Sequence, residues 1–176
     1  MQPLPITDLL LGTDVVSLAR LQLMWQQRGD RLLARFLTQD ELRYCQSALP
    51  EAILLDQLGR HLAKGAMTET TLLPFLRRAA ARIAVKEAVA KALGVGINGF
   101  GYAQGLRWHQ VSVLPATAAS SNPNSFSKAQ GPSVCLTGEA LRVAEQQGVM
   151  TWRVSIAHDG DTALATVIGL VSGFNG

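Results

Sequence analysis

Blocks of hydrophobic and polar positions along the chain predict strands near both ends and helices between them. Residues 9–16 are rich in Leu and Val, as in a short buried strand. Residues 151–157 and 162–168 alternate in polarity on either side of Asp159-Gly160, a dipeptide that favours a tight hairpin turn. We expect further strands over residues 106–114 and 133–137, and helices over 17–28, 38–49, 82–93 and 138–147. Thr38 and Glu41 have the spacing of a capping box.

Length and composition predict one domain over residues 1–176. With 176 residues and 48% hydrophobic content, the chain is long enough to bury one core of ordinary size. Two segments fall outside the regular pattern. Residues 50–76 have the apolar spacing of one or two extra helical pieces, and residues 115–130, rich in Ala, Ser, Asn and Thr, predict a loop without secondary structure.

The segment over residues 82–96 places charged side chains on a strong helix former. Ala, Leu, Lys and Glu favour a helix, and Gly94 and Gly96 supply the positive-φ exit that ends it. Glu87, Lys91 and Gly94 follow one another at i, i+4 and i+7, on a strip separate from the apolar stripe. Two interpretations remain open at this point. The pair is either a solvated ion pair, worth about 0.2–0.5 kcal/mol to the helix, or a functional acid and base.

An acidic residue, Asp14, interrupts the apolar first strand together with Gly12. Both residue types are uncommon in strands, and a buried carboxylate needs a counter-charge, a set of hydrogen bonds or a metal ion. Gly12 would let another backbone or a ligand come close. Asp14 is therefore either a functional acid or the residue that ends the strand and caps the helix beginning at Ser17.

A histidine, His158, lies between the strand predicted over residues 151–157 and the hairpin turn. A side chain at the end of a strand lies at the rim of a sheet. Imidazoles at such positions either contact a ligand or are merely exposed. The position alone leaves both interpretations open.

Composition narrows the classes of function. The net charge is +3, and Arg20, Arg28, Arg31 and Arg35 fall in one predicted helical region. This pattern fits an acidic partner, and it equally fits a solvated helix face. Aromatic residues make up only 6% of the chain, and no basic run is interleaved with them. The sequence therefore argues against nucleic acid as the partner.

The cellular location is expected to be the cytoplasm. Cys45 and Cys135 form no metal-ligand pattern, which predicts reduced thiols. No apolar stretch is long enough to span a membrane, so we expect no membrane partner. The first eight residues also lack the basic residue that precedes the apolar part of a secretory signal.

Five motifs occur in a fixed order along the chain. They are Gly12-Thr13-Asp14-Val15-Val16 followed by Arg20; Phe36-Leu37-Thr38-Gln39-Asp40-Glu41 followed by Tyr44-Cys45; Arg82 to Gly96; Pro132 to Ala140; and Val154 to His158. In this combination the chain resembles the holo-acyl-carrier-protein synthases, the small class of 4′-phosphopantetheinyl transferases. Ile83 stands in place of the family's phenylalanine and Ala157 in place of a hydroxyl residue. Gly131 replaces the lysine that the family carries before Pro132.

The resemblance implies an α+β fold, in which a small antiparallel sheet packs with helices, one of them long and central. It implies a homotrimer with its sites between subunits. The implied activity is transfer of the 4′-phosphopantetheine group of coenzyme A to a serine of apo-acyl carrier protein, with release of adenosine 3′,5′-bisphosphate. Mg²⁺, or Mn²⁺ in its place, is the implied metal, in keeping with a hard cation that bridges phosphates and takes one or two protein carboxylates.

The same resemblance assigns roles to individual residues. Asp14 and Glu87 would bind the metal and would be catalytic together with Lys91. Glu87 and a metal-bound water are the two candidate bases for the attacking serine, and we favour the water, oriented by Glu87. The acidic carrier protein would contact Arg20. Arg28 is a second candidate contact, only because it lies near Arg20 in the same predicted helical region. Coenzyme A would be bound by Arg82, Lys86, Lys91, Gly94, Gly96, Pro132, Ser155 and His158.

Two rival functions come from other classes. One is a catalytically idle module that binds coenzyme A or carrier protein, which the missing lysine favours. The other is a structural trimer with an unrelated ligand. The presence of Asp14, Glu87 and Lys91 favours the transferase.

Overall fold

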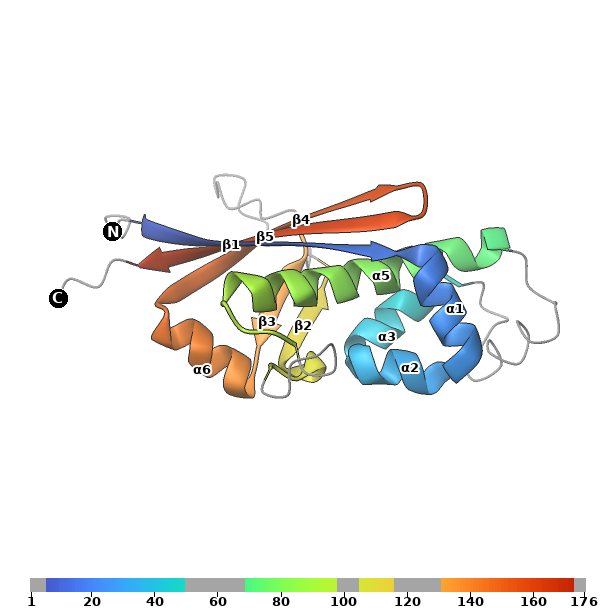
Figure 1. Ribbon diagram of the computed structural model, residues 1–176, viewed down its shortest axis with the longest axis horizontal. Helices are drawn as coiled ribbons and strands as arrows, with labels where there is room; N and C mark the ends of the chain where they lie inside the picture. Colours follow the sequence, from blue (N-terminus) through green and yellow to red (C-terminus); the bar gives the residue numbers. More distant parts are fainter. Residues whose placement is uncertain (1–5, 50–68, 98–104, 116–130, 173–176) are drawn as a thin grey trace, which may run out of the picture.

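The computed structural model describes residues 6–49, 69–97, 105–115 and 131–172, which form an α+β fold of layered sheets and helices (Figure 1). The elements in chain order are β1 (Ile6–Ser17), α1 (Leu18–Arg28), α2 (Asp30–Phe36), α3 (Gln39–Gln46), α5 (Glu69–Ala92), the 3₁₀-helix η1 (Trp108–Gln110), β2 (Val111–Leu114), β3 (Ser133–Leu136), α6 (Gly138–Gln146), β4 (Val149–Asp159) and β5 (Thr162–Ser172). One sheet has the strand order β1-β5-β4, and a second contains β2 and β3. Both sheets are antiparallel.

The predicted C-terminal hairpin is confirmed. β4 and β5 pair from Asp159 and Thr162 outward, and Gly160 in the turn has a φ of 50°, which an L side chain rarely adopts. β5 lies in the middle of the sheet, because β1 pairs along its other edge. The first and last strands of the chain are therefore neighbours.

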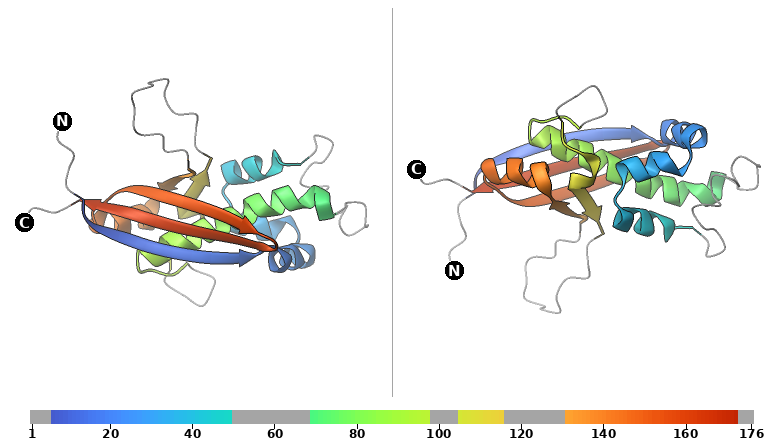
Figure 2. Two further views of the ribbon diagram at one scale, coloured as in Figure 1. Left: turned by 90° about the horizontal axis from the view of Figure 1, so that it is seen from above. Right: turned by 90° about the horizontal axis from the view of Figure 1, so that it is seen from below.

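The long helix α5 packs against one face of the three-stranded sheet, and no helix among the described residues covers the other face (Figure 2). The predicted apolar stripe of α5 is confirmed, since Val85, Ala88, Val89 and Leu93 are buried. Alanines dominate the buried part of this helix, and small side chains let it lie close to the strands. Helices α1, α2 and α3 pack at the N-terminal end of α5, and α6 packs beside the β2–β3 sheet (Figure 1).

Hydrogen bonds at the helix ends explain two of the boundaries. Ser17 caps α1, because its Oγ accepts from the backbone N–H of Arg20 at 3.2 Å and donates to Asp161 Oδ2 at 2.9 Å. The interpretation that Asp14 caps this helix is therefore wrong. The capping box predicted at the start of α3 is confirmed, with both reciprocal bonds between Thr38 and Glu41 present.

Some predicted boundaries were wrong. The strand expected over residues 106–114 begins only at Val111, because Trp108 turns its indole into the core through the 3₁₀-helix η1. The helix expected over 38–49 ends at Gln46. Of the extra helical segment expected over 50–76, residues 69–76 belong to α5, and residues 50–68 lie outside the described residues. The loop predicted over 115–130 lies outside them too, except for residue 115.

Two further observations concern the described part of the chain. Cys45 and Cys135 are free thiols, the first buried and the second exposed. None of the helices in this part combines the length and the apolar character needed to cross a membrane.

Candidate functional site

The site forms where β1 crosses α5, and Gly12 sets how closely the two elements approach. A Cβ atom at residue 12 would lie 1.9 Å from the carbonyl oxygen of Ala88 and 2.9 Å from the backbone nitrogen of Ala92. Only glycine fits such a backbone-to-backbone contact. Asp14, two residues along the same strand, points to the same face as Gly12 and is thereby brought to α5.

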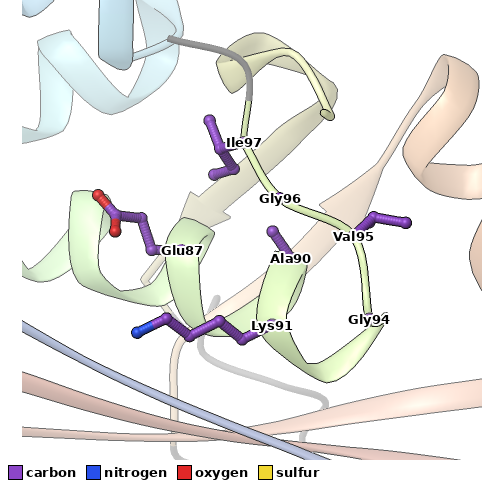
Figure 3. Close-up of a pocket in the computed structure, with 7 residues that line it drawn as sticks. All are labelled: Glu87, Ala90, Lys91, Gly94, Val95, Gly96 and Ile97. Atoms are coloured by element: carbon purple, nitrogen blue, oxygen red, sulfur yellow. The ribbon is translucent and has the colours of Figure 1, made fainter. Parts of the chain in front are cut away.

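Asp14 forms an ion pair with Lys91 of α5. Asp14 Oδ1 lies 2.7 Å from Lys91 Nζ, which also donates to the carbonyl oxygen of Thr13 at 3.1 Å. The Asp14 side chain is only 10% exposed, whereas that of Lys91 is 56% exposed. Lys91 therefore links α5 to β1. A solvated ion pair between Glu87 and Lys91 along the surface of α5, the alternative considered from the sequence, would not make this link. Figure 3 shows the lysine extending from α5 toward β1.

Glu87 lies one turn before Lys91 on the same edge of α5 (Figure 3) and is partly buried. Burial first, and then the nearby carboxylate of Asp14, raise the pKa of its carboxyl to about 7 against the lowering effect of Lys91 and Arg20. Besides burial, Asp14 therefore lies close enough to Glu87 to disfavour its charged form. Two carboxyl groups and an ammonium group meet at this point of the fold.

This donor set fits a hard divalent cation. Magnesium takes oxygen ligands and uses only one or two protein carboxylates, filling its other positions with water and substrate. Asp14 and Glu87 supply such a pair, and a cation between them would relieve the repulsion that raises the pKa of Glu87. Among the described residues there is no cluster of three or more His, Cys, Asp or Glu side chains, as an all-protein metal cage would need.

Two cavities flank these charges, and Glu87 lines both. The first, of about 260 Å³, runs along the end of α5 and is lined by Glu87, Ala90, Lys91, Gly94, Val95, Gly96 and Ile97 (Figure 3). Its wall turns at Gly94, which has a φ of 69° and forms the helix C-terminus through bonds from Gly94 N to Lys91 O and from Val95 N to Ala90 O. The predicted ligand residues Lys91, Gly94 and Gly96 therefore lie together.

The second cavity, of about 320 Å³, lies between α1 and α5 on the other side of Glu87. It is lined by Val15, Val16, Ser17, Arg20, Leu21, Met24, Phe36, Ile83 and Glu87. Most of this wall is apolar, with one cation at Arg20. The predicted carrier contact Arg20 thus lies in the site, whereas Arg28 falls two turns further along α1, about 12 Å away along the helix axis.

Lys86, predicted to bind coenzyme A, lies in the protein core instead. Its side chain is fully buried, and Nζ lies 2.7 Å from Glu41 Oε2 and donates to the carbonyl oxygens of Phe36 and Trp108 at 2.8 and 3.0 Å. An ammonium group has three N–H donors, and all three are occupied by these partners. We therefore do not retain Lys86 in the ligand site. Burial of Lys86 could not be predicted from local sequence patterns, because its partners Glu41, Phe36 and Trp108 come from other elements.

Arg82 and His158 are close to each other, within a basic cluster that sequence patterns only partly indicated. Burial lowers the pKa of His158, and the guanidinium groups of Arg77 and Arg82 lower it further. Arg82 is only 4% exposed and lies over the ring of Tyr44, 4.1 Å from its centroid. The Nε atoms of Arg77 and Arg82 are buried and have no hydrogen-bond partner within the described residues. Arg77 was not identified from the sequence.

The remaining predicted residues lie outside both cavities. Ser155 pairs in register with Thr166 on the open face of the sheet, whereas His158 pairs with Ala163, which is buried on the opposite face. Pro132 precedes β3, and the neighbouring Gly131 lies against the backbone of Val154 on β4. In this chain these residues therefore do not line the cavities that Glu87 and Lys91 line.

Comparison with known proteins gives one consistent family. Residues 10–157 match the profile of the 4′-phosphopantetheinyl transferase superfamily. A holo-[acyl-carrier-protein] synthase of Solidesulfovibrio magneticus is 36% identical over 158 residues, which cover 90% of this chain and 94% of that protein. A second, of Gloeobacter violaceus, is 31% identical over 157 residues, 89% of either protein. The crystal structure of a Helicobacter pylori holo-[acyl-carrier-protein] synthase in complex with coenzyme A shares the fold, with a TM-score of 0.55 and 22% identity over 93% of this chain and 99% of that one.

Proposed function

This chain belongs to the 4′-phosphopantetheinyl transferase superfamily, and from that premise we propose that it transfers the 4′-phosphopantetheine group of coenzyme A to a serine of apo-acyl carrier protein. Relatives named as holo-[acyl-carrier-protein] synthases match along nearly the whole chain. The observation that carries the proposal is the meeting of Asp14, Glu87 and Lys91 between two cavities.

The reaction is a phosphoryl transfer. The serine oxygen forms a bond to the β-phosphorus of coenzyme A, the bond from this phosphorus to the bridging oxygen breaks, and adenosine 3′,5′-bisphosphate leaves. Such reactions depend on positioning and on neutralisation of charge. Mg²⁺ held by Asp14 and Glu87 would supply charge neutralisation on the pyrophosphate. Lys91, the most exposed of the three groups, places its ammonium on the phosphate oxygens. A water oriented by Glu87 receives the serine proton.

Each of the two cavities binds one substrate. Coenzyme A occupies the cavity lined by Lys91, Gly94 and Gly96, so that its pyrophosphate meets the ammonium. The carrier protein approaches from the α1 side, where Arg20 attracts its acidic helix. Glu87 lines both cavities and therefore stands where donor and acceptor meet.

We also propose that the protein is a homotrimer with its sites between subunits. Leu9, Leu11 and Val15 of β1 are 54%, 60% and 57% exposed. They pair in register with Leu170, Ile168 and Leu164 of β5, so they form apolar rows across the uncovered face of the sheet. Apolar side chains exposed together on one face of a sheet favour an interface, and here the polar pair of Thr13 and Thr166 lies between the apolar rows.

A transfer assay tests the proposed activity. Wild-type protein incubated with apo-acyl carrier protein, coenzyme A and Mg²⁺ should release adenosine 3′,5′-bisphosphate and add the phosphopantetheine mass to the carrier. Asp14→Asn and Glu87→Gln should each lower kcat by about 10²-fold or more while the fold is retained. Asp40→Asn is the matched control, because Asp40 is an exposed carboxylate paired with Arg43, and it should transfer at the wild-type rate. Saturable binding of coenzyme A without release of the bisphosphate would instead identify an idle binding module.

A further inference from the structure

The buried pair of Glu41 and Lys86 connects several elements that surround the site. Both side chains are fully buried. Besides the ion pair, Glu41 Oε2 accepts from the backbone N–H of Thr38 at 2.7 Å, and Glu41 Oε1 accepts from that of Val113 at 2.7 Å. Together with the two carbonyl groups bound by Lys86, these contacts tie α5 to α3, to β2, to η1 and to the end of α2. Every polar atom of the pair thus has a partner.

The end of α2 is held by side chains from two distant segments. Lys86 Nζ donates to the carbonyl oxygen of Phe36, and His109 Nε2 lies 2.9 Å from the carbonyl oxygen of Ala34 and 3.1 Å from that of Leu37. Carbonyl groups at a helix C-terminus have no partner within the helix, so such donors fix its position. The turn that carries Phe36 is therefore clamped from outside α2.

Phe36 is part of the cavity that also contains Glu87. Its ring contacts Trp108 edge to face, with centroids 4.7 Å apart, and both residues offer their carbonyl oxygens to the same ammonium. Lys86 precedes Glu87 directly in α5. One side chain therefore fixes the distance between Phe36 on the cavity wall and the acid at its end.

We propose that Lys86, held by Glu41, is a positioning residue that sets the wall of the carrier-side cavity relative to Glu87. This proposal rests on the proposed function, because it assumes that the carrier protein enters between α1 and α5. Buried ion pairs contribute little net stability compared with apolar residues of similar volume. A role in geometry gives a physical reason to bury one beside the site.

Two variants test this role. Lys86→Met removes the ammonium but leaves Glu41 buried without its counter-charge, which strongly lowers the free energy of unfolding. The double variant with Glu41→Gln and Lys86→Met removes both charges and keeps an acceptor for the backbone N–H of Val113. The control is Val111→Ala, which opens a cavity in the same core without touching the pair, since Val111 is fully buried. For each protein we would measure Tm, then kcat and the KM of both substrates well below the lowest Tm.

A positioning role predicts a selective change. KM for apo-acyl carrier protein should rise about ten-fold in the double variant, and kcat should fall, while KM for coenzyme A stays within about two-fold of the wild-type value. The control should lose Tm but keep both KM values. A stability role alone would lower Tm and leave the KM for carrier unchanged, and that result in a folded double variant would overturn the proposal.

Binding measurements separate the proposal from the proposed function. Affinity for unmodified acyl carrier protein, measured by calorimetry without coenzyme A, should fall by about the same factor as KM rises. Should the wild type bind the carrier but release no adenosine bisphosphate, the proposed activity fails, and weaker carrier binding by the double variant still supports the positioning role. Should the wild type not bind the carrier, both are refuted.

Discussion

Gly12 offers a decisive test, because the structure shows what a single added methyl group would displace. The Cβ atom of Gly12→Ala would lie 1.9 Å from the carbonyl oxygen of Ala88, where an ordinary contact begins at 3.4 Å. The neighbouring atoms are backbone atoms of α5, which no rotamer change can move away. Strand and helix must therefore separate by about 1.5 Å to restore an ordinary contact.

The separation acts on stability and on activity. Overpacking of this kind costs about 1–3 kcal/mol, or more where backbone has to move. It also carries Asp14 away from Glu87 and Lys91, and a shift of about 1 Å in a catalytic constellation costs on the order of 10²-fold in rate. We expect Gly12→Ala to lower the transfer rate by at least that factor, measured as release of adenosine 3′,5′-bisphosphate at a temperature where the variant remains folded.

Gly160→Ala is the matched control. Gly160 has a φ of 50° and nothing within 4 Å of a Cβ atom, so alanine there meets only the cost of the left-handed conformation, about 1–2 kcal/mol. This variant should lose stability but keep its transfer rate. If folded Gly12→Ala transferred as fast as Gly160→Ala, the close approach of β1 and α5 would not be what positions the site.

Two further predictions address charge and assembly. Because burial and Asp14 raise the pKa of Glu87 to about 7, its neutral form favours the folded state, so this contribution is complete below pH 4.5 and is lost as pH rises through about 7. In metal-free buffer Glu87→Gln should therefore exceed the wild type in Tm above pH 7 and match it near pH 4; a difference independent of pH would contradict the shift. Leu11→Lys places a charge on the apolar face of the sheet and should give monomers by light scattering, whereas an exposed Asp40→Asn variant should not. A wild-type protein that is monomeric at all concentrations would refute the trimer.

Local chemistry predicted the elements whose signals lie close together in sequence. The turn at Asp159-Gly160 and the capping box of Thr38 and Glu41 depend on residues within a few positions of one another, and both are confirmed. The apolar stripe of α5 follows from helical periodicity alone and is confirmed as well. The beginning of β2 was misplaced, because Trp108 is turned inward by its contact with Phe36 from another element.

The candidate site was predicted only as far as residue types and motifs allow. Asp14, Glu87 and Lys91 were named from the sequence, and the fold brings them together. Lys86 and Arg82 lie on one strip of the helix. Helical periodicity therefore could not predict which of the two would be held in the core by an ion pair and which would lie beside His158. Glu41 and two backbone carbonyl groups hold Lys86 in the core, whereas the donors of Arg82 remain beside His158.

By itself, the sequence determined most of the strands and helices, though not α2 or η1, together with where α1 and α3 begin, where α5 ends, and which acids and bases are available for chemistry. Helix and strand propensity, periodicity and capping act over a few residues, so they can be read from the sequence alone. Only the tertiary structure decided that β1 lies beside β5, that Gly12 meets Ala88, and that one of two adjacent charged residues, Lys86 and Glu87, is buried while the other lines the site. Those outcomes depend on packing and desolvation, which are set by neighbours that are distant in sequence.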